Sequence, residues 1–307
     1  MGRYVIRRLL QMIPVFFGTT LLIFLMVNVM GDPIAGLCGE RQCDPSTAAR
    51  LRADFGLDKP VWQQYATYMG NVFTGDFGTA FNGQKVTELM ATAFPITIRL
   101  TIVAIVFEIV IGISLGVVTG LRRGRPVDTG VLILTLVVIS IPTFVTGLLL
   151  QLLLGVEWGV IKPSVSPEAP VDELIVPGLV LASVSLAYVT RLTRTSIAEN
   201  ARADYVRTAV AKGLPRRRVV IRHLLRNSLI PVVTFIGTDV GALMGGAIVT
   251  ERIFNIHGVG YQLYQGILRQ NSQTVVGFVT ILVLVFLAAN LIVDLLYAVL
   301  DPRIRYA

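Results

Sequence analysis

The sequence predicts an all-α polytopic membrane protein with six transmembrane helices and both termini in the cytoplasm. Composition, the lengths of the apolar segments and the placement of Lys and Arg lead to this prediction. Of the 307 residues, 54% are hydrophobic and 15% are charged, and the mean hydropathy is +0.71. Soluble domains carry about 25% charged residues, so most of this surface is expected to face lipid. The sequence shows no repeats or low-complexity tract, which predicts one membrane domain over residues 1–307.

Six segments reach the roughly 20 apolar residues that a spanning helix needs. They are residues 9–30, 97–120, 129–155, 171–190, 229–250 and 275–300. Three arginines precede the first segment, as in a signal peptide, but its apolar run of about 22 residues exceeds the length of a cleavable signal. It is therefore predicted to be a retained anchor. The fourth segment is the weakest, because two acidic residues and Pro177 lie near its start.

The distribution of basic residues predicts the orientation. The two tails, the turn after the second span and residues 191–228 together hold 18 of the 27 Lys and Arg residues. Cytoplasmic loops are enriched in Lys and Arg, so this side is predicted to be cytoplasmic. Both termini then lie inside, as an even number of spans requires. Residues 191–228 become a cytoplasmic loop and residues 31–95 an extracytoplasmic segment.

The extracytoplasmic segment has a helical pattern of its own in "DKPVWQQYATYMGNVF". Trp62, Tyr65 and Tyr68 lie in this stretch. Two interpretations stay open: an interfacial helix with its aromatic rings at headgroup depth, or a docking surface for an external binding protein.

The two cysteines of the chain, Cys38 and Cys43, fall in the same segment. Thiols outside the cytoplasm tend to be oxidised, so a disulfide between them is expected, with two free thiols as the alternative. A structural zinc site needs four ligands, and both histidines are far away in sequence, so no metal site is expected.

Four charged residues interrupt the apolar segments: Arg99, Glu108, Asp239 and Asp294. A charge at the bilayer centre costs ~2.5 kcal/mol or more, so such residues usually face a bundle interior or a water-filled path. Arg99 and Asp294 lie near span ends, where snorkelling explains them. Glu108 and Asp239 are predicted as residues of a translocation path, with an interhelical hydrogen bond as the alternative for Asp239.

Small residues recur every fourth position in two spans. The positions are Gly112, Gly116 and Gly120 in the second span, and Gly237, Gly241 and Gly245 in the fifth. Such stripes let helix backbones approach closely, which predicts that these two helices pack against other helices.

No sequence motif for catalysis is present: there is no Walker A loop, no G-x-S-x-G and no H-E-x-x-H. The chain is predicted to be no enzyme and to bind no cofactor. Nucleic-acid binding is not expected either, because the basic loop is tethered between two spans.

The basic loop contains "YVRTAVAKGLPRRRVVIRHLLRNSLIP". Its Ala-rich first half predicts a helix that ends at Gly213 as a C-cap, and Pro215 suits the first turn of a second helix. The charge alone is explained by a topological signal. The mixture of basic and apolar residues in the second half also suits contact with anionic membrane lipids.

This stretch resembles the cytoplasmic loop of permease subunits in ATP-binding-cassette importers. "FGLDKPVWQQYATYMGNVFTGDFGTAF", "ERIFNIHGVGYQLYQGILRQ" and "NLIVDLLYAVLDPRIRY" resemble further segments of the same family, in the same order. The resemblance runs from the N-terminus to Tyr306 and is to the first permease subunit of the dipeptide, oligopeptide and nickel group. It implies the type I importer permease fold, in the inner or plasma membrane of a prokaryote.

The resemblance also implies partners: a second homologous permease, two ATP-binding subunits that hold ATP and Mg²⁺, and an extracytoplasmic substrate-binding protein. Dipeptides or oligopeptides are the expected substrates, with nickel, haem or glutathione as alternatives. A different class, an ion-coupled secondary transporter, would need an inverted repeat, which the spans do not show. A membrane scaffold without a pathway is a third hypothesis.

In this family the loop helix docks on an ATPase subunit. By position, the resemblance assigns that contact to Tyr205, Arg207, Ala209, Lys212, Gly213, Leu214 and Pro215. Arg207 stands where the general family has Glu, so a glutamate contact does not transfer, and Arg207 is expected to have an acidic partner. A second departure is "RQNSQTVVG", where relatives have an Asp-Tyr-Pro-like turn, and this leaves the contacts of residues 271–273 open.

Overall fold

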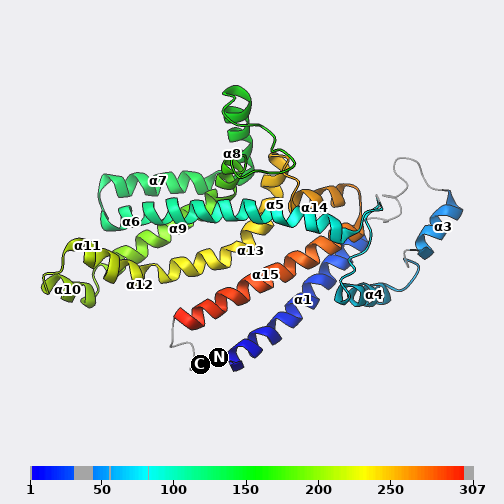
Figure 1. Cartoon of the computed structure of the whole chain (residues 1–307), viewed down its shortest axis with the longest axis horizontal. Coiled ribbons are helices and arrows are strands. Elements are labelled where there is room, and N and C mark those ends of the chain that lie inside the picture. Colours follow the sequence, from blue (N-terminus) through cyan, green and yellow to red (C-terminus); the bar gives the residue numbers. More distant parts are fainter. Residues whose placement is uncertain (1, 31–43, 55–56, 82, 301–307) are drawn as a thin grey trace.

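The computed structural model describes residues 2–30, 44–54, 57–81 and 83–300, and Figure 1 shows their arrangement. Apart from one bridge between Thr79 and Lys85, the regular elements of these residues are helices, as predicted. The membrane helices are α1 (Gly2–Met30), α5 (Val86–Phe107) with η1 (Glu108–Gly112) and α6 (Ile113–Leu121), α7 (Pro126–Ser140), α8 (Thr143–Leu150) with η2 (Gln151–Glu157), α9 (Ile175–Asn200), α13 (Ile230–Ile253) and α15 (Ser272–Leu300). Shorter helices are α3 (Pro45–Asp54), α4 (Val61–Phe73), α10 (Asp204–Ala211), α11 (Arg216–Arg218), η3 (Val219–Leu225), α12 (Arg226–Ser228) and α14 (Val259–Leu268).

Five helical runs in these residues are long and apolar enough to cross a membrane, and the pair formed by α7 with α8–η2 gives a sixth if it is counted as one span. The prediction of one continuous helix over residues 129–155 is wrong, because the pair is bent by 97°. The break falls at Pro142, which has no amide hydrogen to donate and disfavours helical backbone in the residue before it. Ile141 accordingly adopts an extended conformation, with φ −94° and ψ 122°.

The fourth span also differs from its predicted limits. The helix α9 begins at Ile175 and continues to Asn200, ten residues beyond the predicted end at Thr190. Residues 191–200 of the predicted loop therefore extend the helix. The basic segment that remains outside regular spans is residues 201–229, called the basic loop below.

Glycines bring α6 and α9 into direct contact. A Cβ on Gly112, Gly116 or Gly120 would lie 2.9 Å or less from a side-chain atom of α9, contributed by Val189, Thr193 and Ile197 respectively. The predicted close packing of this stripe is therefore confirmed. All the glycine positions face one helix, so α9 is held along three successive turns.

The second stripe faces α15. A Cβ on Gly237 would meet Val293 at 2.7 Å, and one on Gly241 would meet Phe286 at 2.2 Å. Gly245 has no atom within 4 Å of such a Cβ, so the prediction is wrong for this position. Gly245 instead lines a cavity between α1, α13 and α15.

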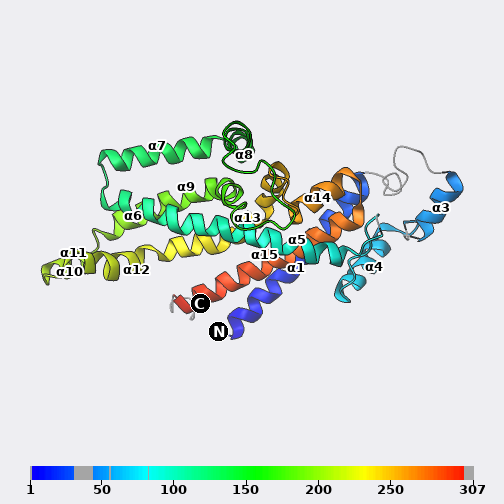
Figure 2. The same ribbon diagram turned by 45° about the horizontal axis from the view of Figure 1, so that its top comes forward.

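Figures 1 and 2 show that α1 lies along α15 and that the first residues of α1 and the last of α15 share one end of the bundle. The turn between α6 and α7 and the basic loop lie toward that same end, and α4 and α14 lie toward the other. The start of α1, the turn between α6 and α7 and the basic loop are therefore grouped at one end, and the orientation of that end across the membrane stays a prediction.

Because the Gly116 Cβ would lie 2.7 Å from the backbone oxygen of Thr190 as well as 2.4 Å from Thr193 Cβ, Gly116→Ala should lower the stability by about 1–3 kcal/mol through overpacking. Gly245→Ala is the matched control. It fills open space and should raise stability slightly, since Ala is favoured over Gly in helices. Thermal unfolding of the purified protein in detergent measures both, and an unchanged or raised midpoint for Gly116→Ala would contradict the packing.

Candidate functional site

The first half of the basic loop is a short helix closed by a glycine. Gly213 has φ +72°, the left-handed conformation that glycine adopts without steric cost. Its N–H donates to the carbonyl of Val210 (2.9 Å), and the N–H of Leu214 donates to the carbonyl of Ala209 (3.3 Å). This pair of bonds is a Schellman motif, and it confirms the predicted end of α10 at Gly213.

The inner side of α10 is seated on a small apolar cluster. The cluster consists of Ile197, Val206, Ala209, Val219 and Leu224, with Leu214 packed against it. Ala209 therefore lies on the buried side of α10, where a partner protein cannot contact it directly.

The outer side of α10 carries the exposed residues. Among the residues that the resemblance assigned to coupling, Tyr205, Arg207 and Lys212 are exposed here, and Gly213 and Pro215 are exposed just beyond. Val210 is also on this side with 61% of its surface exposed. Sequence reasoning did not single out Val210, although an apolar residue between exposed polar ones on a short helix is a usable signal.

Two of the exposed residues, Tyr205 and Arg207, make polar contacts. The acidic partner expected for Arg207 is Asp204 of the same helix, with 3.7 Å between Nη1 and Oδ1. Both side chains are largely exposed, so this ion pair adds little stability. The hydroxyl of Tyr205 donates to Oδ1 of Asn200 (2.7 Å), which ties α10 to the end of α9.

The second half of the basic loop continues into a membrane helix. The predicted second helix is present as α11, η3 and α12, which run into α13. Ser196 donates its hydroxyl to the carbonyl of Ser228 (2.8 Å), and both residues are buried. Arg222, His223 and Arg226 line a cavity of about 530 Å³ beside Tyr205. The loop is therefore joined to α9 and α13 by buried contacts, and its basic side chains remain outside.

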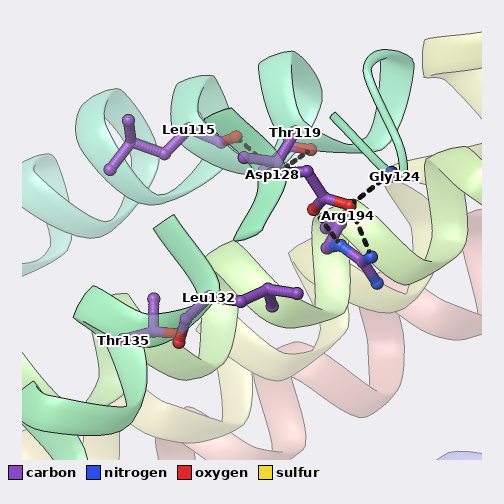
Figure 3. A network of polar contacts seen from close by, with 8 residues as sticks. Leu115, Thr119, Gly124, Asp128, Leu132, Thr135 and Arg194 are labelled. Atoms are coloured by element: carbon purple, nitrogen blue, oxygen red, sulfur yellow. Dashed lines mark hydrogen bonds and ion pairs between the residues drawn. The ribbon is translucent and has the colours of Figure 1, made fainter. Parts of the chain in front are cut away.

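An ion pair braces the same end of the bundle (Figure 3). Arg194 of α9 donates to both carboxylate oxygens of Asp128 at 2.5 and 2.8 Å, and the N–H of Gly124 donates to Asp128 at 2.8 Å. Asp128 is 2% exposed. A bidentate pair has a fixed geometry, so the turn before α7 is held against α9 six residues before that helix ends.

The predicted pathway residues Glu108 and Asp239 come together inside the bundle, where their carboxyl groups face each other. Glu108 is fully buried at the first residue of η1, and among the described residues its carboxyl group has no hydrogen-bond partner besides Asp239. Asp239 lines a cavity of about 370 Å³. The side chain of Asp294 lies outside the described residues.

At the other end, Tyr65 and Tyr68 anchor α4 to two spans. The hydroxyl of Tyr65 lies 2.9 Å from Oγ1 of Thr20, and that of Tyr68 lies 2.7 Å from Oγ1 of Thr280. Burial raises the pKa of Tyr68 to about 12. Trp62 differs from them, because 72% of its surface is exposed. Of the three predicted docking residues, only Trp62 presents its ring outward. Cys38 and Cys43 lie outside the described residues.

Two further contacts order the segments at this end. Oε1 of Gln273 accepts the N–H of Thr79 (2.9 Å). This is one contact of residues 271–273, the segment that departs from the family pattern. Glu173 accepts from Lys162 Nζ and from the N–H of Ser166, both at 2.6 Å. These donors hold the pKa of Glu173 at about 2. Arg99 donates to the carbonyl of Glu168 nearby, at 3.0 Å.

Glu251 is a buried acid that sequence reasoning missed. It is fully buried at the end of α13, and its carboxylate accepts from the hydroxyl of Thr97 (2.6 Å) and the N–H of Tyr261 (3.0 Å). Oγ1 of Thr97 in turn accepts the N–H of Val259 (2.8 Å). Free N–H groups at a helix start favour a carboxylate, so Glu251 joins α5, α13 and the start of α14. A Cβ on Gly258 would lie 2.3 Å from Glu251 Oε1. The sequence signal is the acid followed by Gly258 and Gly260.

Among the residues that the structure describes, no group of three or more His, Cys, Asp or Glu side chains could hold a metal ion. The functional features are instead an outward-facing helix on the basic loop, a carboxylate pair inside the bundle and a braced opposite end. Together with the long apolar helices, these features define a multi-pass membrane subunit.

The comparisons with known proteins identify the family. Residues 112–306 match the family described as binding-protein-dependent transport system inner membrane component, and residues 1–101 match the N-terminal part of the same kind of protein. The chain belongs to this family of membrane permeases, which confirms the resemblance read from its motifs. It is a multi-pass inner-membrane protein.

Named relatives match over the whole chain. The dipeptide transport system permease protein of Escherichia coli (strain K12) is 38% identical over 337 residues, covering 100% of this chain and 99% of the relative. The di/tripeptide transport system permease protein of Pseudomonas aeruginosa (strain UCBPP-PA14) is 38% identical over 331 residues, covering 99% and 98%. The glutathione transport system permease protein of Escherichia coli (strain K12) is 36% identical over 308 residues, covering all of both chains.

Removing the Glu251 carboxylate should loosen α14. In Glu251→Ala the hydroxyl of Thr97 and the N–H of Tyr261 lose their buried acceptor, and we expect a loss of about 3 kcal/mol in stability. Thermal unfolding and hydrogen exchange of residues 259–268 measure the effect, with Glu157→Ala, the removal of an exposed acid, as control. Equal midpoints and equal exchange in the two variants would contradict this role of Glu251.

Proposed function

We propose that the chain is one of two membrane subunits of an ATP-driven importer of peptides, and that it forms half of the translocation path. The observation that carries the proposal is the full-length similarity to permeases named for dipeptide and di/tripeptide transport, at 38% identity. Family membership favours this function over the ion-coupled transporter and the scaffold. The 36% identity to a glutathione permease makes glutathione, itself a small peptide, the second candidate substrate; haem and nickel have no such support here.

The proposed partners are a second homologous permease, two ATP-binding subunits and an extracytoplasmic substrate-binding protein. ATP and Mg²⁺ are bound by the ATP-binding subunits, and this chain contributes no catalytic group. Trp62, exposed on α4, is the proposed contact for the binding protein. The basic cavity beside Tyr205 is suited to the headgroups of anionic membrane lipids.

The outer side of α10 is the proposed seat for an ATP-binding subunit. Arg207 and Val210, three residues apart and therefore neighbours on the helix surface, are exposed there, and Lys212 is exposed at the end of the helix. The motion of the ATP-binding subunit then passes from α10 to α9 and α13, because the apolar cluster below α10 and the bond from Ser196 to Ser228 form one packed connection between them. In this role Ala209, Leu214 and Gly213 shape the helix and its end, and the exposed residues make the contact.

Affinity purification of the tagged chain from its native membranes in mild detergent tests the assembly. We expect a second permease and ATP-binding subunits to co-purify, and ATP-dependent uptake of dipeptides to need the whole assembly. Recovery of the tagged chain alone, from membranes that import dipeptides, would contradict the proposal.

A charge at Gly213 should uncouple the assembly. No atom lies within 4 Å of a Cβ at this position, so Gly213→Glu fits sterically but places a carboxylate at the proposed contact, where it is desolvated on docking. Gly213→Gln is the matched control, since it shares the size and the backbone strain at φ +72°. We expect uptake to fall at least about tenfold for Glu relative to Gln, with equal amounts of the two variants in the membrane by immunoblot. Equal uptake by the two variants would rule out docking at this position.

A further inference from the structure

A cavity beside Asp239 opens between α8, α9 and α13. Its volume is about 370 Å³, and Asp239, Ser185 and Thr143 supply its polar lining. Phe144 and Val249, also in the lining, are 51% and 46% exposed. The cavity is therefore accessible from the surface of this chain and offers one carboxylate and two hydroxyl groups to whatever enters it.

A second carboxylate lies behind the first. Glu108 is fully buried and faces Asp239. Apart from the interaction between the two acids, no group of the described residues donates to either oxygen of Glu108 or to Oδ2 of Asp239. Within the described part of the chain, no Lys, Arg or His forms an ion pair with either residue.

Glu251 is a buried acid with a structural role, and its surroundings differ from those of Glu108 and Asp239. Glu251 is equally buried, but the hydroxyl of Thr97 and the N–H of Tyr261 both donate to its carboxylate. Buried polar groups in native proteins are normally paired, and intramembrane carboxylates normally have a cationic partner or line a path. Within the described residues Glu108 and Asp239 have no partner but each other, and a proton shared between two facing carboxyl groups leaves one negative charge on the pair. A cation that enters through the cavity can pair with that charge.

The backbone is irregular at Glu108. It is the first residue of η1, a π-helical segment inside the long α5–α6 run. The wider turn shifts the side chains that follow relative to a regular helix, and such segments are frequent at functional sites.

We propose that this cavity receives a positively charged side-chain amino group of the substrate during its passage. Asp239 contacts the ammonium group, Ser185 and Thr143 accept its remaining hydrogens, and Glu108 acts as a positioning residue whose carboxyl group faces Asp239 from behind and keeps it at the cavity. An ammonium group has three donors, which matches one carboxylate and two hydroxyl groups. The inference rests on the proposed function and narrows it: the permease favours substrates that carry an additional amino group over substrates that carry an additional carboxylate.

The test compares two peptides in one assembly. Proteoliposomes that contain the complete complex and a saturating amount of binding protein are supplied with alanyl-lysine or alanyl-glutamate, and the initial ATP-dependent uptake rates are expressed as a ratio. We expect Asp239→Asn to lower the lysine-to-glutamate ratio about tenfold, the change that follows from loss of one charge-assisted hydrogen bond. Glu108→Ala, which removes the group that positions Asp239, should lower it in the same direction. Asp172→Asn, which removes an exposed carboxylate outside the cavity, should leave it unchanged.

The ratio does not depend on the amount of folded complex, and the binding protein is the same in every sample. A purely structural role for the pair would lower both rates equally and leave the ratio unchanged in both variants, which overturns the inference while the proposed function stands. If the unaltered complex shows no ATP-dependent uptake of either peptide, the proposed function fails, and this inference fails with it.

Discussion

The close approach of α6 and α9 is the contact on which the other features depend. Gly116 and Gly120 leave no room for a Cβ between the two helices, and within a bilayer such packing replaces the hydrophobic driving force that lipid removes. Because α9 is fixed along this seam, Arg194 reaches Asp128 and Ser196 reaches Ser228. The basic loop below and the cavity above therefore share one rigid helix.

The acids of the chain divide according to whether the protein itself satisfies them. Asp128, Glu173 and Glu251 each accept hydrogen bonds from named donors in the chain, and each holds two segments together. Glu108 is as buried as Glu251, but its partner is a second acid, Asp239. Two facing carboxyl groups share a proton and keep one negative charge, and Asp239 presents that charge to the cavity in the proposed path. In the proposed function, the acids with donors in the chain hold its segments together, and the pair of Glu108 and Asp239 belongs to the translocation path.

In the proposed function, few contacts connect the seat of the ATP-binding subunit on α10 with the cavity beside Asp239. The helix α10 sits on an apolar cluster that includes Ile197 of α9, and the basic loop continues without interruption into α13. Ser185 and Asp239, which line the cavity, belong to those same two helices. A displacement of α10 therefore acts on both walls of the cavity at once, which is the coupling that an alternating-access importer requires.

Composition, apolar length and motif order predicted the helical membrane class, the family and the position of the basic loop. These are local properties. About 20 consecutive apolar residues are long enough to cross a bilayer as a helix, which satisfies its own backbone hydrogen bonds. A glycine such as Gly213 after an Ala-rich stretch is typical of a helix end. The glycine stripe at Gly112, Gly116 and Gly120 likewise predicted close helix packing, but it did not predict that the partner helix is α9.

Only the tertiary structure decided which side chains meet. The bend at Pro142 divided a segment that apolar length treats as continuous. Packing turned Ala209 inward and left Val210 outside. It enclosed Glu251 at the start of α14 with donors from the chain, and in the described part of the chain it left Glu108 and Asp239 with no partner but each other. The sequence by itself determined that these acids lie in apolar helices. It could not determine which of them is satisfied, because a hydrogen bond depends on helices far apart in the chain arriving within about 3 Å of each other.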